Sequence, residues 1–149
     1  MLIRRDRAMV AVTIVLDVAF HGGRSSTVSA ADLAERLGLA RRGMEPLLQA
    51  LSRAGILESV RGPRGGYRLG HARRDIRLSD IAAAATAANP PDTEAPVGRL
   101  QADVVDPVWR QLETAVQAQL ALLTVEDLLR RAAAGGLSRP AGEAITFAI

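Results

Sequence analysis

Residues 29–51 read SAADLAERLGLARRGMEPLLQAL, and this stretch decides the fold. Ser29 and Asp32 have the spacing of a helix N-cap and an acidic third helical position, which predicts a short helix that ends at Leu37. Gly38 follows directly and permits the backbone conformation that a tight turn requires. The stretch therefore predicts a first helix with a sharp turn behind it.

A second helix is predicted after the turn. Its apolar residues are three and four positions apart and form one face, Met44, Leu47, Leu48 and Leu51. Two short helices joined by such a turn indicate a helix-turn-helix, whose second helix enters the major groove of DNA. Many helical hairpins share this pattern, so these residues alone leave both DNA binding and simple helix packing open.

Two short strands are predicted next, over residues 56–60 and 67–69. Residues 61–66 between them read RGPRGG and give the hairpin a basic, glycine-rich tip. Glycines allow close approach to a sugar–phosphate wall, and Arg side chains gain from the negative potential of a narrow minor groove. The alternative is a solvated turn that is basic by composition. Together with the two helices, the hairpin describes a winged helix-turn-helix.

The elements on either side of this unit are predicted from the same local signals. A helix over residues 7–21 precedes the helix-turn-helix, and Ser79 has the position of an N-cap for a short helix over residues 80–88. Residues 89–98 contain three Pro and no apolar periodicity, which predicts a loop.

The longest predicted helix covers residues 105–123 and carries one apolar stripe. Thr124 and Asp127 open a further helix, which ends at a pair of glycines, and residues 144–149 alternate like a short strand. The stripe on the long helix consists of Val108, Leu112, Val116, Leu120 and Leu123.

Charge divides the 149-residue chain into a basic and an acidic half. All 19 basic residues are Arg. Residues 1–77 hold 14 Arg against seven Asp or Glu, a net charge of +7, whereas residues 78–149 hold five Arg against nine, a net charge of −4. This asymmetry indicates a module that binds a polyanion, joined to a second, different module. A GC-rich genome would explain Arg in place of Lys, but not the asymmetry.

Composition also excludes several function classes. The chain has no Cys, which excludes disulfides, thiol catalysis and cysteine-ligated metal clusters. It has no Lys and no spacing typical of a Ser-His-Asp or His-Glu site, and its glycine-rich segment lacks the Lys and the following helix of a phosphate loop. We therefore predict that the protein is not an enzyme. His21 and His71 have no partner at ligand spacing, so we predict no metal and no cofactor.

The start of the chain superficially resembles a signal peptide, because Arg4, Arg5 and Arg7 precede the apolar residues 8–20. Asp17 interrupts this run, and the run is shorter than the roughly 20 apolar residues that span a bilayer. We expect a buried helix here, and a cytoplasmic, nucleoid-associated protein without a membrane partner.

Several segments of the sequence together match one known family. They are residues 16–19 (LDVA), 28–34 (VSAADLA), 51–57 (LSRAGIL) and 59–69 (SVRGPRGGYRL), with looser agreement at residues 109–112 and 123–129. On these residues the chain resembles the Rrf2 family of bacterial winged-helix transcriptional regulators. The segment 59–69 is long and specific, and the match spans most of the chain.

The resemblance implies a mainly α fold with a small β-hairpin wing. It divides the chain into a winged helix-turn-helix DNA-binding domain (1–88), a linker loop (89–104), and dimerisation helices with a C-terminal tail (105–149). It also implies a homodimer that is held together by the long helix. The dimer-interface residues would then be Val108, Trp109, Leu112, Val116, Leu120 and Leu123.

The resemblance further implies where DNA binds, at the start of the recognition helix and on the wing. An Arg at the helix start can bind phosphate or guanine O6 and N7, and Glu45 can accept a hydrogen bond from cytosine N4. The DNA-binding residues predicted in this way are Arg41, Arg42, Gly43, Glu45, Arg61, Gly62, Pro63, Arg64, Gly65, Gly66 and Arg68.

The predicted function is a DNA-binding transcriptional regulator, more a repressor than an activator, that binds a partly palindromic operator as a homodimer. Many members of the family ligate an iron–sulfur cluster through three Cys in the loop before the dimer helix. Residues 89–107 contain no Cys and no His, so we expect regulation without a cluster, by a small molecule, a protein partner or autoregulation. The alternative is a winged-helix scaffold that binds only proteins, and the Arg-rich tip argues against it.

Overall fold

The computed structural model describes residues 5–88 and 94–138. Most of these residues are helical, including a short 3₁₀ turn at Arg73–Asp75 and a π-helical turn at Gln101–Val105. The predicted mainly helical fold with a small hairpin is confirmed. In chain order the elements are α1 (Arg5–His21), α2 (Ala30–Leu37), α3 (Arg41–Arg53), β1 (Leu57–Val60), β2 (Gly66–Leu69), η1 (Arg73–Asp75), α4 (Leu78–Ala88), η2 (Gln101–Val105), α5 (Asp106–Ala121) and α6 (Val125–Ala134).

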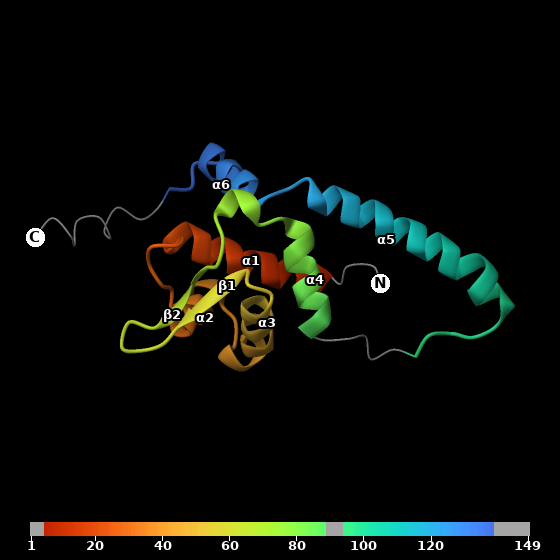
Figure 1. Cartoon of the computed structure of the whole chain (residues 1–149), viewed down its shortest axis with the longest axis horizontal. Helices are drawn as coiled ribbons and strands as arrows, with labels where there is room; N and C mark the ends of the chain where they lie inside the picture. The colour runs from red at the N-terminus through yellow and green to blue at the C-terminus, as the bar shows by residue number, and fades with distance from the viewer. Residues whose placement is uncertain (1–4, 89–93, 139–149) are drawn as a thin grey trace, which may run out of the picture.

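The helix α1 runs through the middle of the molecule, and α2, α4, α6 and β2 all contact it (Figure 1). Its buried residues Ala11, Ile14, Val15 and Val18 recur at helical spacing. Burial of each large apolar side chain contributes about 1.5–3 kcal/mol. The buried helix predicted for residues 7–21 is therefore confirmed.

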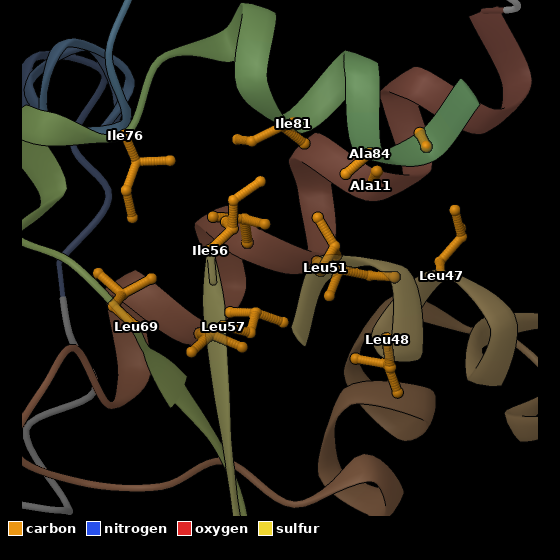
Figure 2. Close-up of a cluster of buried hydrophobic side chains, with 14 of the residues drawn as sticks. Ala11, Leu47, Leu48, Leu51, Ile56, Leu57, Leu69, Ile76, Ile81 and Ala84 are labelled. Atoms are coloured by element: carbon orange, nitrogen blue, oxygen red, sulfur yellow. The ribbon is translucent and has the colours of Figure 1, made fainter. Parts of the chain in front are cut away.

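The hydrophobic core is completed by α3, α4 and the hairpin. Figure 2 shows side chains from these elements directed into one cluster, among them Leu51, Ile56, Leu57 and Ile81. None of these four is more than 4% exposed. Because the helix-turn-helix and the hairpin share this core, their relative position is fixed by packing.

The helix-turn-helix forms as its local signals predict. The hydroxyl of Ser29 accepts a hydrogen bond of 3.1 Å from the amide of Asp32 and caps α2. Gly38 ends α2 in the left-handed conformation, with φ of 64°. The apolar face predicted for the second helix is buried, and it consists of Met44, Leu47, Leu48 and Leu51.

The hairpin is antiparallel, with Leu57 opposite Leu69 and Val60 opposite Gly66. The loop before α2 runs beside it, because Val28 and Tyr67 exchange two backbone hydrogen bonds of 2.8 Å. The hairpin is thus supported on a second side by residues nearly forty positions earlier in the chain.

After α5 the chain returns to the part of the molecule built from α1 to α4 and the hairpin, called the body below. Leu78 donates its amide to the carbonyl of Leu123 (2.9 Å), and Val125 donates to Ile76 (3.0 Å). Val125 is buried, and α6 packs against α1. The predicted N-cap at Thr124 is confirmed, since its side chain and that of Asp127 form a reciprocal capping box.

Two sequence predictions are corrected. Ser79 does not cap the helix after the wing: α4 begins at Leu78, and the carboxylate of Asp80 accepts from the amide of Arg77 (3.3 Å). The backbone pairing of residues 76–78 with 123–125 holds this start in place. Before α5, helical structure begins at Arg99 and continues through the π-helical turn η2, so it starts earlier than residue 105. The strand predicted for residues 144–149 lies outside the described residues.

No helix in the described parts of the chain combines the length and the apolar composition that a membrane span requires.

Candidate nucleic-acid interface

The first turns of α3 present the predicted recognition residues to solvent. Met44 and Leu47 are buried and fix which face of α3 points into the core. The four predicted residues of this helix are all exposed, as recognition requires, and they are Arg41, Arg42, Gly43 and Glu45.

The electrostatics of this helix end favour an anion. Ala40 occupies the N-cap position of α3, and no side chain accepts a hydrogen bond from the first turn. The amides at a helix N-terminus carry partial positive charge, which attracts phosphate. Arg41 and Arg42 add two full positive charges at the same place.

The tip of the hairpin is also exposed, at Arg61, Gly62, Pro63 and Arg64. The hydroxyl of Thr27 donates a hydrogen bond of 2.7 Å to the carbonyl of Arg64. This bond attaches the tip to the loop before α2 and limits its movement relative to the helix-turn-helix.

Two glycines of the tip are required by the protein itself. A Cβ on Gly66 would lie 2.4 Å from the carbonyl oxygen of Val28, and one on Gly65 would lie 2.5 Å from that of Val60. Both contacts are with backbone, which cannot move aside cheaply. The sequence prediction explained these glycines by close approach to DNA, whereas the structure shows that the packing of the wing already demands them.

Arg68 forms an ion pair within the hairpin. It lies opposite Glu58 in the strand register, and its Nε and Nη2 atoms donate hydrogen bonds of 3.0 Å each to the two carboxylate oxygens. These two hydrogen bonds and the positive charge of Arg68 lower the pKa of Glu58, and the charge of Arg24 lowers it by a smaller amount. The same hydrogen bonds and the negative charge of Glu58 raise the pKa of Arg68. Arg68 is therefore less available to DNA than Arg61 and Arg64 are.

Sequence reasoning missed Glu58, Arg24 and Thr27. Glu58 could have been found from the register, because a five-residue tip places it opposite Arg68. Arg24 and Thr27 had no local signal, since they belong to a loop that reaches the wing only in the folded chain.

The apolar stripe of α5 divides into two parts. At its N-terminal end, Val108, Trp109 and Leu112 are 50%, 46% and 44% exposed. At the other end, Leu120 and Leu123 pack against the core of the body. Val116 lies between them and is half-buried. Figure 1 shows the N-terminal part of α5 extending away from the body.

A helix-turn-helix, a basic hairpin fixed to it by a common core, and a long helix with exposed apolar residues define a winged-helix DNA-binding regulator. The chain belongs to the Rrf2 family: the family model, described as an iron-dependent transcriptional regulator, matches residues 5–131. The resemblance found in the sequence is confirmed.

Curated relatives and solved structures agree with this assignment. The chain is 35% identical to the HTH-type transcriptional regulator IscR of Vibrio atlanticus (strain LGP32), over 84% of this chain and 73% of that protein. It is 32% identical to protein rrf2 of Nitratidesulfovibrio vulgaris, over 85% and 86%. Two solved structures have TM-scores of 0.65: IscR of T. potens, at 27% identity over 90% of each chain, and CymR (YrzC), the global cysteine regulator of B. subtilis, at 28% over 86% and 96%.

These relatives are transcriptional regulators, and the chain is a DNA-binding transcriptional regulator of their family.

The family is described as iron-dependent, so the residues of this chain must be compared with those that bind iron. Iron–sulfur clusters are held by Cys thiolates, and this chain has no Cys. The described residues before α5, 94–105, offer only the carboxylates of Glu94 and Asp103. Across the two described ranges, no three His, Asp or Glu side chains gather closely enough to hold a metal ion. The residues do not fit a thiolate-held cluster, so iron dependence is not transferred to this chain.

Proposed function

We propose that this protein is a homodimeric repressor that binds a partly palindromic operator without an iron–sulfur cluster, and that it acts on the nucleoid in the cytoplasm. The observation that carries the proposal is the exposure of Arg residues at both the start of α3 and the wing tip, on elements that share one core. A shared core holds two contacts in a fixed geometry, which is the requirement for reading one stretch of DNA.

In this proposal α3 enters the major groove and the wing enters the adjacent minor groove. Arg41 and Arg42 bind phosphate or the O6 and N7 atoms of guanine, and Glu45 accepts from cytosine N4. Gly43 lets the backbone of the helix start approach the DNA. On the wing, Arg61 and Arg64 enter the minor groove, and Arg68 contacts DNA only after it leaves Glu58. The remaining wing residues, Gly62, Pro63, Gly65 and Gly66, shape the tip.

The dimer in this proposal is built on α5. Large apolar side chains in a row on an exposed helix mark a surface that another molecule covers. A second copy would cover Val108, Trp109 and Leu112 with the same residues of its own α5, since a two-fold interface is self-complementary. The half-buried Val116, Leu120 and Leu123 continue the interface toward the body. Two copies then present two recognition helices to two half-sites.

The test begins with selection of genomic fragments by the purified protein, followed by titration of affinity against salt. A protein that neutralises several phosphates shows log affinity falling steeply with log salt, and a specific site binds about 10³-fold or more tighter than random DNA. Transcription in vitro from a promoter that overlaps the selected site should fall when the protein is added. Weak binding without sequence preference at every salt concentration would overturn the proposal.

A further inference from the structure

An apolar groove of about 260 Å³ lies where α1, the end of α2 and the residues after α6 meet. Leu16 and Phe20 line it from α1, and Leu37 is the last residue of α2. Leu137 closes the opposite side and is 64% exposed. Leu16, Phe20 and Leu37 are only half-buried, so the groove is an apolar surface open to water.

The charge at the groove is already neutralised inside the protein. The carboxylate of Asp17 faces it with a side chain only 7% exposed. Arg36 donates hydrogen bonds of 2.8 and 3.1 Å to the two oxygens of this carboxylate. A charged ligand would have to separate Arg36 from Asp17, and this would leave a buried carboxylate without its partner. The groove therefore fits an uncharged, apolar occupant.

The chain's own C-terminal segment has this chemistry and starts at the groove. Leu137 and Ser138 line the groove, and the next residues, 139–149, read RPAGEAITFAI. Ile145, Phe147 and Ile149 alternate with small residues, so an extended segment would place them on one side. The six residues between Ser138 and Ile145 include Pro and Gly, which are common in turns.

We propose that residues 144–149 dock in this groove of their own chain, with Phe147 as the central apolar group. The short connection keeps the segment at a high local concentration, and the entropy lost on closing so short a loop is small. The docked segment would contact Leu37, directly before the turn at Gly38, and would link the end of the chain to the helix-turn-helix.

Disulfide trapping tests the proposal directly, because a chain without Cys gives a clean background. The variant Thr13→Cys/Thr146→Cys of the 149-residue chain places one thiol in the groove lining and one in the segment. The control is Ala83→Cys/Thr146→Cys, since Ala83 is exposed on α4 and does not line the groove. We expect an intrachain disulfide to form about tenfold faster in the groove pair than in the control, because docking raises the effective concentration of the thiols. Adding Phe147→Asp should remove this difference.

A second measurement keeps the proposal testable if a variant misfolds. Deletion of residues 139–149 should raise the fluorescence of a bound apolar dye and leave the far-UV circular dichroism of the helices unchanged. Equal disulfide rates in the two pairs, or unchanged dye binding after the deletion, would overturn the proposal. A disulfide formed only between chains would also overturn it, by placing the segment on a second copy. The test uses no DNA, so its outcome is independent of the proposed repressor function.

Discussion

The winged-helix body and the N-terminal half of α5 differ in how far their apolar side chains are buried. In the body, Leu51 is fully buried and the exposed surface carries Arg. On α5, Leu112 and Trp109 remain nearly half exposed although their spacing is that of a core-facing stripe. The body thus completes its core within one chain, whereas α5 carries an apolar face that residues 5–88 and 94–138 leave exposed.

The two regions should also respond to different variables. Contacts between Arg and phosphate weaken steeply with salt, because binding releases counterions. Burial of apolar surface depends little on salt and is proportional to the area removed from water. Experiments that vary salt, concentration and single side chains can therefore separate the DNA surface from the α5 surface.

The largest effect is expected on α5. Leu112→Asp should raise the dissociation constant of the proposed dimer about 100-fold or more, because a carboxylate without a partner is costly to bury. Sedimentation velocity over a range of protein concentrations measures the change. Gln117→Asp is the matched control, since Gln117 is exposed on α5 outside the apolar stripe and should leave the dimer intact. A Leu112→Asp protein that stays dimeric would show that α5 does not form the interface.

In the body, we expect the substitution Gly66→Ala to have the largest effect on stability. Gly66→Ala should lower the free energy of unfolding by about 1–3 kcal/mol, because its Cβ would meet the carbonyl of Val28 and its φ of 156° is unfavourable for Ala. Gly43→Ala is the control: it lies in α3 with open space around it and should be neutral or stabilise by about 0.5–1 kcal/mol. Denaturant unfolding of both variants checks this, and equal midpoints would contradict it.

The sequence predicts best those features whose signals lie within four residues. Ser29 with Asp32, and Thr124 with Asp127, form the expected caps because a cap is a local hydrogen bond. Ser79 fails for the opposite reason: the start of α4 is decided by backbone pairing with residues 123–125, more than forty positions away. No local pattern contains that information.

The candidate site shows the same division. The exposure of Arg41 and Arg61 follows from the periodicity of α3 and from the turn residues of the wing, which are local. The pairing of Arg68 with Glu58 depends on strand register, and the bond from Thr27 to Arg64 joins residues 37 positions apart. The sequence thus identifies which Arg residues are candidates, but only the fold shows which of them is already neutralised.

A smaller effect is expected at the wing tip. Arg61→Ala should weaken operator binding several-fold and reduce the slope of log affinity against log salt by about 1, without changing stability or dimerisation. Arg99→Ala is the control, because Arg99 is 96% exposed in its side chain and lies just before η2, away from the winged helix. Fluorescence anisotropy with operator DNA at several salt concentrations measures both quantities. Unchanged affinity would remove the wing from the mechanism.

The smallest effect, and the most specific, is expected at Glu58. Glu58→Gln removes the carboxylate that holds Arg68, so operator affinity should rise about two- to threefold, with a steeper salt dependence from one more available cation. Arg68→Ala alone should change affinity little, because Arg68 is already paired. If Arg68→Ala weakens binding as much as Arg61→Ala does, then Arg68 leaves Glu58 in the complex and the ion pair does not restrain the wing.

The same pair predicts the direction of a pH effect. Because the pKa of Glu58 is lowered in the folded protein, its ion pair contributes to stability at pH values above the unfolded pKa of about 4.5. That contribution is lost as the pH falls through the lower folded pKa, and Glu58→Gln should abolish this part of the acid sensitivity. The side chains of Glu58 and Arg68 are 54% and 37% exposed, so solvent screens the pair and the change in unfolding midpoint is expected to be small. If the Glu58→Gln protein is equally acid-sensitive, another carboxylate is responsible, and Asp127, whose pKa is lowered by its hydrogen bonds with Thr124, is the next to substitute.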